Sequence, residues 1–264
     1  MNCKIEPNLN QAMQASECLT LLRKGGSSWN RYLQTKGSGI SADLSAINLS
    51  GVDLSGVNLS NAYLSGINLS GAYLSGANLH RACLKEADLS GAFLSHTNLS
   101  NANLSGANLT MATLKLANLT QANLRWANLH KAYLQGAILN RAYAKGANLQ
   151  GAMLRAADLR EAILSQSNLC GANLKRSNLC GANLQEVQAL AAKFIDVKLT
   201  GACLEGWRIN SATQFDQVIC DYIYLKANEQ ERFPQQDKFL PGEFVRMFQQ
   251  AAIAIDFVQS VDGY

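Results

Sequence analysis

The side chains of this chain that could do chemistry are scattered and lack the neighbours that catalysis needs. Each histidine, His80, His96 and His130, falls where no second histidine, cysteine or carboxylate is close in the repeat described below. A general base or a metal site needs such a neighbour. Glu86 and Asp88 are near one another, but both are expected in solvent and do not form a tuned acid–base pair. We therefore expect no catalytic residue, no metal site, no cofactor and no enzyme activity.

The seven cysteines also lack a recognisable pattern, because the chain has no CxxC pair and no histidine at zinc-binding spacing. Cys83 and Cys203 fall on one side of the repeat but six turns of it apart, and Cys170 and Cys180 fall on opposite sides. A disulfide needs Cα atoms within about 7 Å of one another. We expect all seven to be reduced thiols.

Five residues repeat from Ser41 to about Ile209, and this repeat must position every other feature of the chain. The leucine position, called i here, is Leu at 28 of 29 places between residues 44 and 184, with Ala144 as the exception. Position i−2 is Ala at 22 of these places, and position i−1 is Asn or Asp at 19. A short fixed period of this kind sets the fold before any other signal is weighed.

A five-residue period excludes the two common regular structures. Five residues advance about 500° around a helix of 3.6 residues per turn, so the leucines would spiral and face no core. In a continuous strand the inward face would flip from one repeat to the next. The period fits a short extended piece with i−2 and i inward, followed by a turn at i+1 and i+2. Repeated turns of one hand give closed coils, which stack by parallel pairing about 4.8 Å apart.

Runs such as Ala77-Asn78-Leu79, Ala107-Asn108-Leu109 and Ala117-Asn118-Leu119 resemble the A(D/N)LXX consensus of the pentapeptide repeat proteins. The resemblance covers roughly two-thirds of the chain. It implies an all-β solenoid, a right-handed quadrilateral parallel β-helix with four pentapeptides per coil. At twenty residues per coil, such a rod would hold a little over eight coils and be about 40 Å long.

The chain divides into three expected segments: an N-terminal helical cap at 1–38, the β-helix at 39–225, and a C-terminal loop and helix at 226–264. Helices are expected from about Leu9 to Lys24 and from Ser27 to Leu33. An extra residue predicts a bulge near 210–213. The segment Lys226–Lys238 is predicted to be a loop, and a helix is predicted from Pro241.

The C-terminal helix either caps the solenoid or pairs with a partner or a second copy, and the sequence leaves both open. We expect a monomer or a weak dimer through a solenoid end or this helix. The run from Phe239 to Phe244 resembles a segment that follows the repeats in some cyanobacterial pentapeptide repeat proteins, which predicts a cyanobacterial source. No apolar run reaches about 18 residues, and residues 1–7 lack the apolar core of a signal peptide, so no membrane contact and a cytoplasmic location are expected.

The candidate partner face is a row of outward residues at twenty-residue spacing. Tyr73, Phe93, Tyr133 and Met153 should share one side of the rod, with Thr113 interrupting the row. Basic residues accompany them at the next corner, namely Lys115, Arg155, Lys175 and Arg176. Exposed aromatic residues beside arginines are typical of interface centres. The alternative is that the rings merely stabilise adjacent coils, and the C-terminal helix could also cover this face.

Three functions follow, in order of preference. The first is a non-enzymatic scaffold that binds an unidentified protein through a flat solenoid face. The second is binding of nucleic acid or an acidic partner by a basic band within residues 115–176, which contains Lys115, Arg125, Lys131, Arg141, Lys145, Arg155, Arg160, Lys175 and Arg176. The third, ranked last, is inhibition of DNA gyrase by mimicry of DNA, which the resemblance raises but the basic middle coils oppose.

Overall fold

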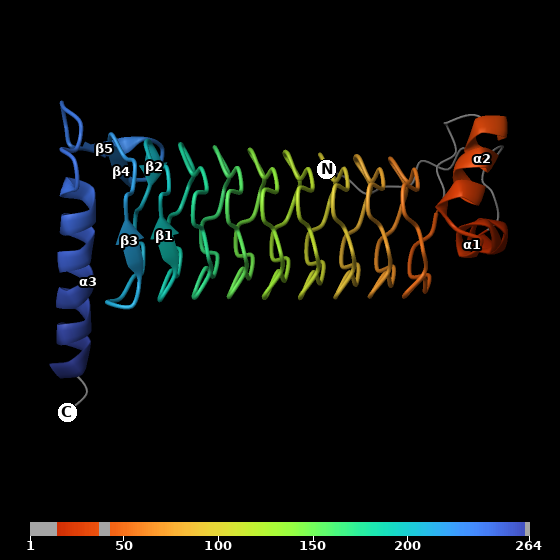
Figure 1. The fold of residues 1–264 in the computed structure, drawn as a ribbon, viewed down its shortest axis with the longest axis horizontal. Helices are drawn as coiled ribbons and strands as arrows, with labels where there is room; N and C mark the ends of the chain where they lie inside the picture. The colour runs from red at the N-terminus through yellow and green to blue at the C-terminus, as the bar shows by residue number, and fades with distance from the viewer. Residues whose placement is uncertain (1–14, 37–42, 262–264) are drawn as a thin grey trace.

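The protein is a straight rod of stacked coils closed at both ends by helices (Figure 1). The computed structural model describes residues 15–36 and 43–261. Helices α1 and α2 lie at one end of the rod, and α3 lies across the other. The regular elements in chain order are α1 (Ala15–Arg23), α2 (Gly26–Lys36), β1 (Lys193–Ile195), β2 (Ala202–Cys203), β3 (Gln214–Asp216), β4 (Ile223–Lys226), β5 (Gln230–Phe233) and α3 (Glu243–Val261).

Each coil of the rod contains twenty residues, so four pentapeptides make one turn as predicted. Parallel bridges join Asp53 to Tyr73, Tyr73 to Phe93 and Asn48 to Asn68, and the same step continues along every side. Between the bridged residues, the backbone hydrogen bonds also run from coil to coil, as from the Leu74 amide to the Phe93 carbonyl at 2.8 Å. A side offers a single bridged residue before the chain turns, and for this reason the middle of the rod has bridges but no extended strands.

The corners explain why the sequence repeats Asn, Leu and Gly. At each corner an amide closes a turn back to the leucine carbonyl, as from Ala77 to Leu74 at 3.0 Å. The third residue of the turn has a positive φ, 67° at Gly76, which glycine adopts most easily. The Asn or Asp before the leucine accepts from the amide two residues on, as Asn68 Oδ1 does from Ser70 at 2.9 Å. Asparagine at i−1 therefore satisfies the backbone of its own corner.

The core is a column of leucine and alanine side chains at positions i and i−2. These side chains are almost entirely buried along the whole rod. Burial of one leucine contributes about 1.5 to 3 kcal/mol, and the contributions accumulate coil by coil. The outward position i−1 is thereby free to vary without disturbing the column.

Helix α2 supplies the hydrogen bonds that a preceding coil would have made. In the regular coils an i−1 residue such as Asn78 accepts from an amide of the coil before it and donates to a carbonyl there. For Asn58, in the first coil, Trp29 Nε1 donates to the carbonyl at 2.7 Å. The Asn30 Oδ1 accepts from the Asn58 amide at 2.7 Å. Side chains of α2 thus close the exposed edge of the solenoid at Asn58.

The bounds of the first two helices differ from those predicted. Helix α1 begins at Ala15 in the described residues and ends at Arg23, and residues 9–14 of the predicted helix lie outside the described range. Helix α2 begins at Gly26, one residue earlier than predicted, and continues to Lys36. A Cβ at residue 26 would lie 2.8 Å from the Ser55 carbonyl oxygen, so glycine permits the helix to approach the first coil.

The C-terminal end is irregular and aromatic. The pairing step changes from twenty residues, Gln188 to Arg208, to twenty-one residues, Lys193 to Gln214. The extra residue predicted near 210–213 is therefore present. Strand β1 pairs with β3 and β2 with β4, both in parallel. The core column ends in a cluster of five aromatic rings. Phe194, Trp207 and Phe215 belong to the last coils, and Phe244 and Phe248 belong to α3.

Two expectations about this region and the cysteines are wrong. The segment predicted as a loop, Lys226–Lys238, contains β5, which pairs antiparallel with β4 as a hairpin. Three consecutive polar residues, Gln230 to Arg232, make this segment look like a loop, although it forms a half-exposed strand. The expectation of seven reduced thiols also fails, because Cys83 is disulfide-bonded. Five other cysteines are free: Cys18, Cys170, Cys180, Cys203 and Cys220.

Candidate interaction surface

The predicted row of outward residues forms one continuous side of the rod, called the Tyr73 face here. It consists of Tyr73, Phe93, Thr113, Tyr133 and Met153, each bridged to the next. The four large side chains are exposed, at 49% for Tyr73, 42% for Phe93 and 38% for both Tyr133 and Met153. The rings of Tyr73 and Phe93 stack with centroids 4.9 Å apart and planes within 6°. These side chains are outside the core and remain accessible to a partner.

Two residues that were not predicted from the sequence flank this face. Met111 and Leu116 occupy the corners on either side of Thr113, and each is 55% exposed. Both have a positive φ of 57°, a conformation that is uncommon for bulky residues. Their position, i+2, is where most other repeats carry glycine or a polar residue. A bulky residue at position i+2 is the sequence signal by which Met111 and Leu116 could have been recognised.

Leu116 leans over the next coil instead of projecting freely. A Cβ added at Gly136 would lie 2.7 Å from its Cδ2 atom. The Leu116 side chain therefore covers the corner of the coil that carries Tyr133. The exposed apolar area widens at the middle of the Tyr73 face, where the row itself is interrupted by Thr113.

The basic band does not lie on one side, because the five-residue period distributes its members over all four corners. One corner, called the basic edge here, borders the Tyr73 face and carries Lys115, Arg155, Lys175 and Arg176. Arg176 Nε lies 3.6 Å from Asp196. Among the described residues, no carboxylate is within salt-bridge distance of Lys115, Arg155 or Lys175. The basic edge thus keeps three unpaired cations beside the apolar row.

Elsewhere the band is partly neutralised. Arg141 Nε donates to Glu161 at 2.7 Å, and Arg160 binds Asp158 through two bonds of 2.8 and 2.6 Å. Hydrogen bonding from these arginines lowers the pKa of both carboxylates below the usual range. The full band therefore cannot act as one electrostatic stripe.

The opposite side, called the Tyr63 face here, has three smaller residues in the middle of its row, whereas the Tyr73 face is interrupted only at Thr113. Its outward residues are Tyr63, Cys83, Asn103, Asn123, Tyr143 and Ile163. The guanidinium of Arg125 lies 4.9 Å from the Tyr143 ring centroid. Nearby Trp126, 64% exposed at a corner with φ of 59°, covers Gly146 of the next coil. This aromatic cluster is compact and also escaped the sequence analysis.

Asparagine side chains of successive coils are hydrogen-bonded to one another along parts of the rod. Asn148 Nδ2 donates to Asn128 Oδ1 at 3.1 Å, and Asn108 donates to Asp88 at 3.1 Å. These bonds run along the rod from coil to coil. The asparagine rows are therefore accounted for by structure and need no ligand.

No catalytic constellation is formed by the described residues. Within 15–36 and 43–261 no group of three His, Cys, Asp or Glu side chains could hold a metal ion. Burial raises the pKa of the Cys18, Cys180 and Cys203 thiols, and it raises that of Cys220 to about 12. These thiols are therefore protonated near neutral pH and are poor nucleophiles.

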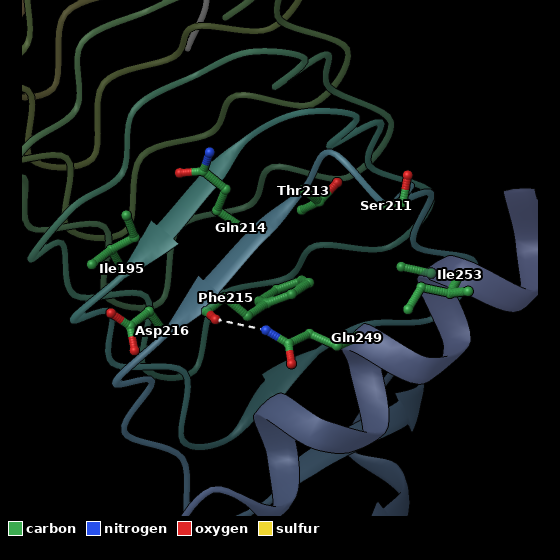
Figure 2. A pocket seen from close by; sticks show the side chains of 9 residues that line it. Ile195, Ser211, Thr213, Gln214, Phe215, Asp216, Gln249 and Ile253 are labelled. Atoms are coloured by element: carbon green, nitrogen blue, oxygen red, sulfur yellow. Dashed lines mark hydrogen bonds between the residues drawn. The ribbon is translucent and has the colours of Figure 1, made fainter.

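A cavity of about 480 Å³ lies between the last coil and α3 (Figure 2). Ser211, Thr213, Gln249 and Ile253 are among its lining residues. The dashed line in Figure 2 is the bond from Gln249 Nε2 to the Phe215 carbonyl, 3.2 Å long. Asp216 is the only ionisable residue in the lining, so the cavity offers no acid–base pair. It forms where the helix rests on the end coil.

Helix α3 covers the end of the rod and leaves the Tyr73 face open. Phe244 and Phe248 contact Phe215 of β3 at the end coil. Figure 1 shows the helix perpendicular to the rod, beyond the last coil. The suggestion that the C-terminal helix also covers the Tyr73 face is therefore wrong for the part of α3 whose side chains are described.

The fold defines this protein as a four-sided parallel solenoid, and comparison with known proteins assigns its family. The family described as pentapeptide repeats matches in eight copies, over residues 42–81, 53–91, 82–121, 122–160, 154–187 and 172–206. This chain belongs to the pentapeptide repeat family. Membership, together with the structures below, implies the right-handed quadrilateral β-helix that the sequence predicted.

Solved structures of other pentapeptide repeat proteins are similar to the rod. HetL, involved in heterocyst differentiation regulation in the cyanobacterium Nostoc sp. strain PCC 7120, is 31% identical, with a TM-score of 0.54 over 75% of this chain and 98% of HetL. QnrB1, a plasmid-mediated fluoroquinolone resistance protein, is 15% identical, with a TM-score of 0.48 over 69% of this chain and 92% of QnrB1.

A pentapeptide repeat protein from the Arabidopsis thaliana thylakoid lumen is 34% identical, with a TM-score of 0.25 over 36% of this chain and 66% of its own. A search of curated proteins finds no match. No helix among the described residues has the length and apolar character needed to cross a bilayer. The cyanobacterial source and the cytoplasmic location stay predictions.

Proposed function

We propose that this protein is a non-enzymatic scaffold that binds another protein through the Tyr73 face. The observation that carries the proposal is the row of four large exposed side chains on one side of the rod, at one-coil spacing except where Thr113 separates Phe93 from Tyr133. Single exposed apolar residues are normal on protein surfaces, whereas a contiguous row marks an interaction site. Tyrosine, phenylalanine, methionine and arginine are also the residues enriched at interface cores.

The backbone behind this row supports a binding role. Each outward residue is fixed to the preceding coil by two backbone hydrogen bonds, as for Phe93, whose amide donates to the Ala72 carbonyl and whose carbonyl accepts from the Leu74 amide. A surface ordered before binding loses little conformational entropy when it binds. The similarity to HetL, a protein involved in regulation, supports a regulatory role exerted by binding.

The test compares two double variants that each remove two outward rings. Phe93→Ser with Tyr133→Ser changes the Tyr73 face, and Tyr63→Ser with Tyr143→Ser is the matched control on the Tyr63 face. We expect a protein captured by the wild type to be retained by the control and lost by the Tyr73-face variant. The melting temperature of both variants should change little, because all four side chains lie outside the core column.

The opposite result would mean that the rings have only a structural role. If Phe93→Ser with Tyr133→Ser lowers the melting temperature strongly while the surviving folded protein still binds the captured partner, the rings only stabilise adjacent coils. Equal loss of capture in both variants would also contradict the proposal.

Binding of nucleic acid is the second candidate function, favoured by the unpaired cations of the basic edge. Salt-sensitive binding of duplex DNA, absent from a Lys115→Gln, Arg155→Gln, Lys175→Gln variant, would promote it. DNA mimicry stays last, because the Tyr73 face between Tyr73 and Lys193 carries no carboxylate. Inhibition of gyrase in a supercoiling assay would reverse that order.

A further inference from the structure

The Tyr73 face has a low point at Thr113, and the surrounding residues turn it into a site. Along the rod, the half-buried Thr113 is bridged to Phe93 on one side and to Tyr133 on the other. These two rings are two coils apart, about 10 Å at β spacing. The distance leaves room for one aliphatic or aromatic side chain above the smaller threonine.

Two bulky corner residues complete the site across the face. Met111 precedes Thr113 at one corner, and Leu116 follows it at the other, both 55% exposed. One coil earlier, these corners carry Gly91 and His96. The low point lies between Phe93 and Tyr133 along the rod and between the corners of Met111 and Leu116 across the face. These residues are called the Thr113 site here: Phe93, Met111, Thr113, Leu116 and Tyr133.

The charge beside the site selects the kind of partner. Lys115 belongs to the same coil as Thr113, and Arg155 and Lys175 follow two and three coils further along the basic edge. None of the three has a carboxylate within salt-bridge distance among the described residues. A segment bearing carboxylates would gain these cations without competing with an existing pair.

We propose that the Thr113 site anchors one bulky apolar side chain of an acidic partner segment, whose carboxylates pair with Lys115, Arg155 and Lys175. The inference rests on the proposed function and narrows the partner to an acidic peptide with an apolar anchor. The anchor supplies burial at the centre of the contact, and the basic edge supplies orientation and salt dependence.

The test fills the site without weakening the fold. In Thr113→Phe, the new ring continues the stack between Phe93 and Tyr133, so the melting temperature should be unchanged or higher. Asn123→Phe is the matched control, because Asn123 is a half-buried outward residue on the Tyr63 face. Lys115→Glu with Arg155→Glu reverses the basic edge, and Arg125→Glu with Lys145→Glu is its control on the far side.

The probe is a phage-displayed library of random 16-residue peptides selected on the wild-type protein. We expect the selected peptides to be rich in Asp and Glu around one large apolar residue. Their affinity should fall at least about tenfold in Thr113→Phe and in the reversed basic edge, and stay within about twofold in both controls. Binding should also weaken as salt increases.

Three results would overturn the inference: no peptide is selected, the peptides lack acidic residues, or Thr113→Phe binds them as well as the wild type. The proposed function can hold even where this inference fails. If Phe93→Ser with Tyr133→Ser abolishes capture of a native partner and Thr113→Phe does not, the face is an interface but the Thr113 site is not its anchor.

Discussion

The Tyr73 face and the Tyr63 face have the same backbone and differ in the side chains that they display. On the Tyr73 face, Tyr73 and Phe93 stack at 4.9 Å, and the row of exposed apolar side chains continues to Met153. On the Tyr63 face, Asn123 donates to Asn103 at 3.0 Å, so the middle of the row is polar and bonded to itself. Opposite sides of one solenoid can therefore have different roles without any change in fold.

The corners beside the two faces differ in the same way. Arg141 and Arg160, at the corner between Asp158 and the Tyr63 face, are paired with Glu161 and Asp158. The basic edge beside the Tyr73 face keeps Lys115, Arg155 and Lys175 without such pairs in the described structure. Charge is therefore neutralised internally at this corner of the Tyr63 face, whereas Lys115, Arg155 and Lys175 remain available to a partner.

Truncation of a buried leucine should have the largest effect, and it tests whether the two faces share one core. Leu114→Ala lies behind the Tyr73 face and Leu104→Ala behind the Tyr63 face, and both leucines are fully buried. Each substitution should lower the free energy of unfolding by about 2 to 5 kcal/mol, because it leaves a cavity in the column. Denaturant unfolding measures the loss for each variant.

The two losses should be similar, since the leucine environment repeats from side to side. A much larger loss behind the Tyr73 face would mean that its stacked rings and the core act together. That result would contradict the separation of a structural interior from a binding exterior.

The repeat allowed the fold to be predicted almost completely, and the reason is physical. A five-residue period excludes helix and continuous strand, and Leu44 to Leu184 fill the column with almost one residue type. Twenty-residue spacing then places Tyr73, Phe93, Tyr133 and Met153 on one side, as found. The four sides and the hand came from the family resemblance, because the period alone requires only a closed coil.

Features that depend on single contacts escaped the sequence. Trp29 and Asn30 replace the bonds of a missing coil, which their helical spacing does not reveal. The strand β5 lies in a polar segment whose composition indicates a loop. Met111 and Leu116 stand at corner positions where the repeat predicts a turn, so their role beside Thr113 became visible only when the corners were placed around the face.

A smaller effect distinguishes the two bulky corners from an ordinary one. Gly171→Ala meets nothing within 4 Å, so it should cost about 1 kcal/mol for the positive φ alone. Gly136→Ala must displace Leu116 beside the Tyr73 face, and Gly146→Ala must displace Trp126 near the Tyr63 face. Each should cost about 1 kcal/mol more.

Thermal unfolding measures these costs, and tryptophan fluorescence reports the displacement of Trp126 in Gly146→Ala. If Gly136→Ala and Gly146→Ala match Gly171→Ala, the two bulky side chains move freely. They would then not shape the surface beside either face.

The smallest effect depends on pH and concerns the corner where Arg141 and Arg160 pair with Glu161 and Asp158. Hydrogen bonds from Arg160 and Arg141 lower the pKa of Asp158 and Glu161. A carboxylate with a lowered folded pKa adds stability in full above its ordinary pKa, about 4, and loses it as the pH falls through the folded value. Asp158→Asn with Glu161→Gln should therefore be slightly less stable than the wild type at pH 7, and this difference should shrink as the pH falls below about 4 and through the folded pKa values. Lys115→Gln with Arg155→Gln removes cations that have no described carboxylate partner, so its stability relative to the wild type should not change over that range. A pH-dependent difference in the second variant, measured by thermal unfolding from pH 7 to pH 2, would show that the basic edge is also neutralised within the protein and is not reserved for a partner.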